Sequence, residues 1–61
     1  MIIKCCIIEN SAECANAIKE MESRIPCFSS LDLLDENSIE YTISCREEDV
    51  IYVEKTLAEF V

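Results

Sequence analysis

Apolar and polar residues alternate in short blocks along this chain, and the spacing within each block predicts five elements of secondary structure. Three blocks have the two-residue period of a strand, and two have the three-to-four-residue period of an amphipathic helix. The expected order is strand, helix, strand, strand, helix within residues 1–61. This order predicts a single small α+β domain.

The first expected strand, residues 2–8, is largely apolar on both of its faces. Its alternating side chains form two sets, with Ile3, Cys5 and Ile7 on one face and Ile2, Lys4, Cys6 and Ile8 on the other. An edge strand with one face in water does not need so much apolar surface. We therefore expect this strand to be central, or covered on both faces in one chain or in a complex.

The first expected helix has an apolar stripe at helical intervals, made of Ala15, Ile18, Met21 and Ile25. Asn10 and Glu13 have the spacing of a capping box at its start. Glu20 and Arg24 are spaced for an i,i+4 ion pair. Pro26 should end the helix, because proline disfavours the α conformation at the residue before it.

Residues 27–34 predict a second strand, and Asp35-Glu36-Asn37-Ser38 has the composition of a hairpin turn. The third strand alternates most regularly, with Ile39, Tyr41, Ile43 and Cys45 on one face and Glu40, Thr42 and Ser44 on the other. Such a pattern is typical of an antiparallel strand with one face in the core and the other in water.

The second expected helix follows another capping box, Ser44 and Glu47, and has acidic residues in its first turn, where the helix dipole favours them. Its apolar stripe consists of Val50, Val53, Leu57 and Phe60 with Val61. Residues 50–53 alone would also fit a strand, but the length and the capping favour a helix.

These elements predict a split β-α-β unit, because a right-handed crossover leaves room for the third strand between the first two. The sheet order would be 1-3-2, with both helices on one face and the first strand at an open edge. Two copies pairing antiparallel along that edge would form a six-stranded sheet. The side chains expected at this dimer interface are Ile2, Lys4, Cys6 and Ile8.

Length and charge also favour a protein that works in a complex. A domain of this size buries only about 60% of the surface of its unfolded chain, so a partner often supplies the missing core. The net charge of −8, from thirteen acids and five bases, repels nucleic acid and favours a partner with a basic or apolar docking surface. The chain has no evident export signal or membrane span, so we expect a cytoplasmic or nuclear protein without membrane contact.

Candidate chemistry is sparse, and we expect neither catalysis nor a cofactor. There is no histidine and no glycine, so the usual general base and the phosphate-binding loop are both missing. Cys5, Cys27 and Cys45 have the parity to share a core face and could hold a soft metal, but small buried thiols are the favoured interpretation. The acidic run 47–49 should fan out around its helix rather than converge on a metal.

The order of the elements, the segment 39–50 (IEYTISCREEDV) and the helix that ends at Leu57-Ala-Glu-Phe60 resemble the Pcc-type small subunit of the KEOPS complex. This resemblance implies a non-catalytic homodimer that docks by its helices onto the ATPase-fold subunit of a tRNA threonylcarbamoyladenosine machinery. Partner contacts would then fall on the flank of the last helix, at Ile51, Tyr52 and Lys55.

Three hypotheses of function follow from the sequence. The first is a non-catalytic, homodimeric assembly subunit that docks onto a larger protein. The second is a small acidic inhibitor or decoy whose carboxylates imitate a phosphate backbone on a basic protein. The third is a thiolate metal or redox module, which requires bound metal or thiols of lowered pKa.

Overall fold

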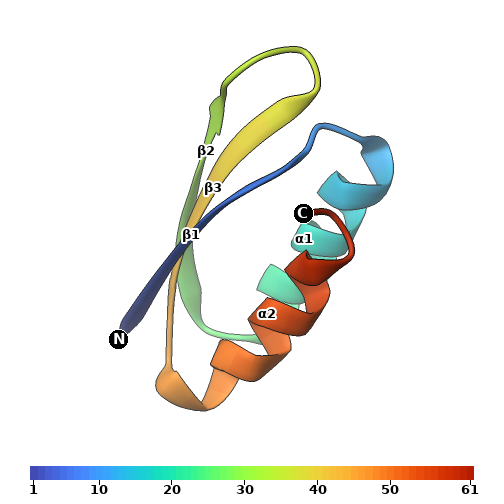
Figure 1. Ribbon diagram of the computed structural model, residues 1–61. Helices are drawn as coiled ribbons and strands as arrows, with labels where there is room; N and C mark the ends of the chain where they lie inside the picture. Colours follow the sequence, from blue (N-terminus) through green and yellow to red (C-terminus); the bar gives the residue numbers. More distant parts are fainter.

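The computed structural model describes all residues, 1–61, and confirms the expected order of elements. The strands are β1 (Ile2–Glu9), β2 (Cys27–Leu33) and β3 (Ser38–Cys45), and the helices are α1 (Ala12–Arg24) and α2 (Val50–Ala58), with a short 3₁₀ turn, η1 (Glu47–Asp49), before α2. The molecule has two layers, with the sheet on one side and both helices on the other (Figure 1).

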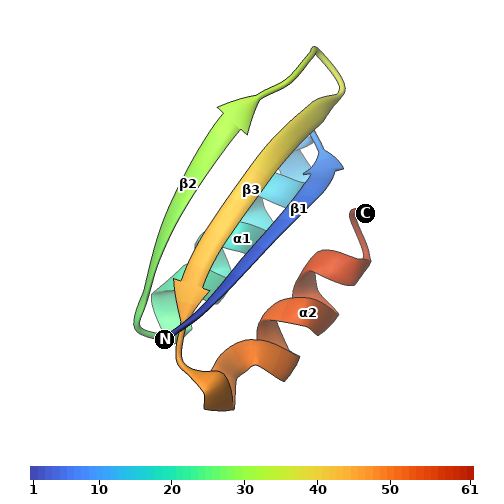
Figure 2. The same ribbon diagram turned by 60° about the vertical axis from the view of Figure 1, so that its left-hand side comes forward.

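The three strands form one antiparallel sheet in the order β1-β3-β2, as expected (Figure 2). The pairing of β1 with β3 runs from Ile2 opposite Cys45 to Glu9 opposite Ser38. Within one chain β1 is neither central nor covered on its second face, so that part of the expectation is wrong. Coverage by another chain remains as the alternative.

The helix α1 begins one residue later than its expected capping box implies. Ser11 is the N-cap, and its Oγ accepts a hydrogen bond from the Cys14 amide at 3.1 Å. The prediction of a capping box at Asn10 and Glu13 is therefore wrong. The Asn10 side-chain amide instead donates to the carbonyl of Glu36 at 3.2 Å, so this residue ties the start of the helix to the β2–β3 turn.

The end of α1 is as expected. Ile25 has left the α region, with φ −131° and ψ 151°, as a residue before proline should. Arg24 and Glu20 form the expected i,i+4 ion pair. The hairpin turn is also confirmed, because the amide of Asn37 donates to Asp35 Oδ1 at 2.7 Å.

The start of α2 differs from the expected one, although the helix itself is confirmed. Ser44 lies within β3, and no side chain caps η1 or α2, so the second capping box is wrong. Arg46 joins the strand to the helical turn through its Nε, which lies 2.8 Å from Asp49 Oδ2. Val61 is exposed at the end of the chain and does not belong to the apolar stripe of α2.

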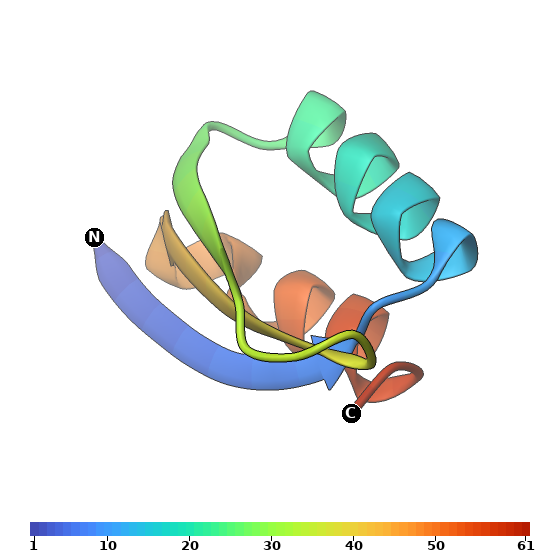
Figure 3. The same cartoon turned by 90° about the horizontal axis from the view of Figure 1, so that it is seen from above.

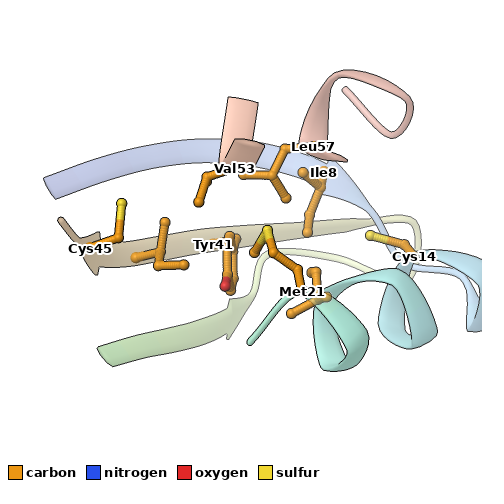
Figure 4. Packing of buried hydrophobic residues seen from close by; sticks show 9 residues of the cluster. Ile8, Cys14, Met21, Tyr41, Cys45, Val53 and Leu57 are labelled. Atoms are coloured by element: carbon orange, nitrogen blue, oxygen red, sulfur yellow. The ribbon is translucent and has the colours of Figure 1, made fainter. Parts of the chain in front are cut away.

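The core lies between the two layers and is small, with nine of the 61 residues buried. It consists of Ile8, Cys14, Ile18, Met21, Tyr41, Ile43, Cys45, Val53 and Leu57 (Figure 4). The central strand contributes three of these side chains, because its inward face lies under both helices. So small a core is typical of a chain that gains stability from association.

Tyr41 joins α1 to the sheet through the one polar network that reaches the core. Its hydroxyl donates to Glu22 Oε2 at 2.5 Å, and the hydroxyl of Ser29 donates to the same oxygen at 2.8 Å. Burial, together with the hydrogen bond to the Glu22 carboxylate, raises the pKa of Tyr41 above its ordinary value. The phenol therefore remains a neutral donor throughout the usual pH range.

Candidate interaction surface

The sheet has one face that no element of the chain covers. Both helices lie on the same side of the curved sheet (Figure 3), and the buried side chains of β3 point toward them. The alternate strand residues therefore face away from the helices. We call this side the open face, and its strand residues are Ile3, Cys5, Ile7 and Glu9 of β1, Phe28, Ser30 and Asp32 of β2, and Ser38, Glu40, Thr42 and Ser44 of β3.

The register arranges the open face in rows that change from apolar to acidic along the strands. One row places Ser44 between Ile3 and Phe28, and these two apolar side chains are 69% and 76% exposed. Two rows further along, Glu40 lies between Ile7 and Asp32. The open face thus has an apolar end and an acidic end.

Between these ends lies a row of small side chains, in which Thr42 separates Cys5 from Ser30. The Thr42 hydroxyl donates to Cys5 Sγ at 3.5 Å. No bulky side chain stands in this row, so a partner surface could approach the sheet closely here.

None of the five basic residues lies at a strand position of the open face. Lys4 points to the helix side, where its Nζ lies 2.8 Å from Glu54 Oε1. Arg46 is paired with two acids of η1, and the remaining three bases belong to α1 and α2. The acids of the open face are therefore without a neighbouring cation in the sheet.

The side chains expected at the dimer interface all lie on the helix side of β1. Ile8 is only 2% exposed and belongs to the core, so it is not available to a second copy. Cys6 packs against the core, and Lys4 is paired with Glu54. Ile2 is 38% exposed. What β1 does offer a second copy is its outer backbone edge, because β3 is its only partner strand.

The residues expected to contact a larger protein lie on α2 and differ in accessibility. Ile51 and Lys55 are exposed and one helical turn apart, whereas Tyr52 is half-buried against the core. The backbone carbonyl of Tyr52 accepts a hydrogen bond from the Thr56 hydroxyl. Two of the three side chains are thus free for contact in the single chain.

A groove of about 350 Å³ lies between α1 and β2. Apolar side chains of both elements line it, including Ile18 and Leu31. Leu31 and Leu33 remain exposed although they are on the helix side of the sheet, because α1 does not extend over the outer edge of β2. A second groove, of about 410 Å³, lies beside β1 and α2.

All five cysteines are free thiols. Cys14 and Cys45 are buried, and Cys5 is exposed on the open face. Burial raises the pKa of the Cys6, Cys14 and Cys27 thiols, which disfavours the thiolate that metal binding or redox chemistry requires. No three His, Cys, Asp or Glu side chains are placed to hold a metal ion together.

The sequence of β2 contains a signal for the open face at Phe28. Phe28 breaks the alternation of β2, and it does so because it lies on the outward face together with Ser30 and Asp32. Aromatic residues are enriched in protein interfaces, so this exposed aromatic side chain is a candidate contact.

Neither helix has the length and apolar character needed to cross a bilayer. No protein-family model, curated protein or solved structure matches this chain.

Proposed function

We propose that this protein is a non-catalytic assembly subunit that pairs with a second copy along β1 and docks onto a larger protein. The observation that carries the proposal is the edge of β1, an eight-residue strand with one unpaired backbone side. Exposed edges of β-branched apolar sequence are templates for pairing with another chain. Only Lys4 places a charge within the central part of this strand.

The geometry of a strand pair limits the registers that the proposed dimer can adopt. Two antiparallel copies in one continuous sheet must pair residues that point to the same face. Two registers of equal length meet this condition, one centred on Cys5 and the other on Cys6. The register centred on Cys6 would place Ile3 opposite Glu9 of the second copy, so we propose the register centred on Cys5. It places Ile3 opposite Ile7 of the second copy and Cys5 opposite its own equivalent. On the helix side it places Lys4 opposite Cys6 of the second copy.

This register contains favourable pairs and no like charges directly opposite one another within the strand. The contact between Ile3 and Ile7 occurs twice by symmetry, and cross-strand apolar pairs contribute about 0.2–1 kcal/mol each. The two open faces become one six-stranded face, and the small cores of the two copies become neighbours. Pairing along β1 thereby supplies part of the burial that one chain lacks.

Sedimentation equilibrium tests the pairing, with a double variant that blocks the edge. Ile3→Lys with Ile7→Lys would place lysines opposite one another across the symmetry axis. Leu33→Lys with Leu31→Lys is a matched control on β2, since Ile3 and Leu33 are both 69% exposed and Ile7 and Leu31 both 55%. We expect wild type and control to have twice the 7.0 kDa mass of one chain, and the β1 variant to be monomeric.

Two results would contradict this pairing. A wild-type protein that is monomeric at all concentrations would remove the dimer from the proposal. A dimer that persists in the β1 variant and dissociates in the β2 control would move the interface to the opposite edge. Circular dichroism of each variant excludes unfolding as the cause.

The larger partner is proposed from the resemblance to the Pcc-type KEOPS subunit, which places its contacts on α2. The exposed pair Ile51 and Lys55 supports contact there, with Tyr52 beside them. The resemblance implies an ATPase-fold subunit as the partner, and Ile51→Ala should weaken the complex that the two proteins form in a binding titration. Equal affinity of wild type and variant would contradict a docking role for α2.

A second candidate function, an acidic decoy, is favoured by the carboxylates of the open face without neighbouring bases. Binding of a decoy to a basic protein should weaken steeply as salt is raised, because it depends on exposed charges. Apolar docking should tolerate salt. Affinity measured at two ionic strengths distinguishes these functions.

A further inference from the structure

We propose that the open face of the sheet is itself a docking surface, and that it takes a protein partner presenting an apolar patch beside lysine or arginine side chains. This inference deepens the proposed docking function and rests on it. It does not require the dimer, because each chain has a complete open face.

The apolar end of the open face provides the first argument. Ile3 and Phe28 flank Ser44, and the Ser44 hydroxyl lies 3.9 Å from Met1 Sδ. Met1 is 68% exposed, so three large exposed apolar side chains surround Ser44 at one end of the sheet. Exposed apolar side chains grouped on one face mark interaction sites in soluble domains.

The acidic end provides the second argument. Asp32 and Glu40 are adjacent across β2 and β3, and Glu9 lies at the neighbouring end of β1. No lysine or arginine occupies a strand position on this face. Lys4 lies on the helix side, and the other four belong to α1, to α2 or to the residue before η1. A partner with lysine or arginine beside its apolar patch would match both ends at once.

A second copy of the chain does not fit the open face by stacking. If two open faces stack with their apolar ends together, their acidic ends also meet, with no base to neutralise them. If one copy is reversed, its acidic end covers the apolar end of the other copy. The carboxylates then lose water without gaining a cation. Nucleic acid does not fit either, because its phosphates would face the same acids.

The experiment uses two synthetic amphipathic peptides as probes, one of leucine and lysine and one in which glutamate replaces every lysine. Each is titrated into the ¹⁵N-labelled protein, and the backbone amide shifts report the contact surface. We expect the leucine–lysine peptide to shift amides at Ile3, Ser30 and Thr42, and the leucine–glutamate peptide to leave them unchanged.

Matched variants separate the open face from the helix side of the sheet. Phe28→Ser should weaken binding of the leucine–lysine peptide about tenfold. Leu33→Ser, on the helix side of the same strand and at 69% exposure against 76% for Phe28, should leave it unchanged. Asp32→Asn with Glu40→Gln should weaken it about fivefold, because each exposed charge pair contributes modestly.

The control for charge alone is Glu47→Gln with Glu59→Gln, which removes two acids as well, but from the helical part of the chain. Both of these acids are exposed, whereas Glu40 of the open face is half-buried. This control should bind the peptide as wild type does. Equal losses in both charge variants would overturn the proposal, since they would indicate attraction by net charge. Shifts confined to α2, or equal binding of both peptides, would overturn it as well.

The mass of each sample, measured in parallel, keeps the two proposals distinct. A monomer that binds the peptide on its open face supports this inference and contradicts the pairing along β1. A dimer whose open face binds neither peptide overturns this inference and leaves the pairing intact. Association of the free protein beyond a dimer, with shifts on the open face, would show that the face stacks on itself and would overturn the choice of partner.

Discussion

Replacing Tyr41 by phenylalanine tests the network that fastens α1 to the sheet. The ring is fully buried and stays in place, so the change removes only the hydroxyl that donates to Glu22 at 2.5 Å. Glu22 keeps its second donor, Ser29, and remains partly in contact with water. The variant therefore isolates one hydrogen bond to a carboxylate.

The expected loss of unfolding free energy is about 1.5 kcal/mol. Hydrogen bonds to charged groups contribute about 1.5–3 kcal/mol, and the lower end applies because Glu22 is partly solvated. For a domain whose free energy of unfolding falls by about 1 kcal/mol per molar urea, the midpoint should fall by about 1.5 M. The measurement is urea unfolding followed by circular dichroism at one fixed protein concentration.

Tyr52→Phe is the matched control, because that hydroxyl makes no hydrogen bond within the chain. We expect it to change the free energy of unfolding by less than about 0.5 kcal/mol. If Tyr41→Phe were as stable as wild type within the same margin, the proposed role of the hydroxyl network would be refuted.

Wild type and Tyr41→Phe should also differ in how their free energy of unfolding changes at alkaline pH. The folded state holds the Tyr41 proton above the ordinary pKa of tyrosine, about 10. Above that pH the unfolded chain loses the proton while the folded chain retains it, so stability falls as pH rises. Wild type should lose up to about 1.4 kcal/mol per pH unit more than Tyr41→Phe, and parallel curves above pH 10 would contradict this.

Three further changes test other parts of the structure by urea unfolding. Ser11→Ala should cost about 1 kcal/mol and Ser11→Asp almost nothing, because aspartate also caps helices; equal losses would contradict the cap. Met21→Ala opens a cavity in the core and should cost about 2–5 kcal/mol, and a loss below 1 kcal/mol would contradict tight packing there. Glu54→Gln breaks the exposed pair with Lys4 and should leave the urea midpoint unchanged within error, because water screens exposed charges; a clear fall of the midpoint would show a structural role for that pair.

The period of the apolar residues was sufficient to predict the order of the elements and the sheet. It worked because each strand and helix has one face that must be buried, as β3 shows most clearly. The residue that caps α1 was harder to predict, because Asn10 and Ser11 are adjacent and both suit an N-cap. The choice depends on a distant contact, since Asn10 is held by the carbonyl of Glu36.

Ser44 illustrates the same limit at the second helix. Its spacing from Glu47 fits a capping box, but the residue is held in the ladder opposite Ile3 and Phe28. Tertiary pairing therefore overrides a local signal. A capping box predicts a helix start only where its first residue lies beyond the end of the preceding strand.

The interaction surface was predictable only in part. Apolar side chains on both sides of β1 indicated that another chain covers it, but the pattern does not tell which side chains a second copy would meet. Ile8 shares its face with Lys4 and Cys6, yet it is buried because the end of α2 lies over it. Such a difference arises from the packing of the helix and not from the period of the strand.

Oxidative cross-linking at Cys5 tests the pairing along β1 most directly. In the proposed register Cys5 faces its own equivalent across the symmetry axis, at the Cα separation that a disulfide accepts. Diamide would take two electrons and two protons from the two thiols, and mass spectrometry of the digested product would locate the bond. Pairing along β1 predicts a covalent dimer joined at Cys5, whereas a chain that stays monomeric, or a dimer joined at Cys27 of β2, would contradict that pairing.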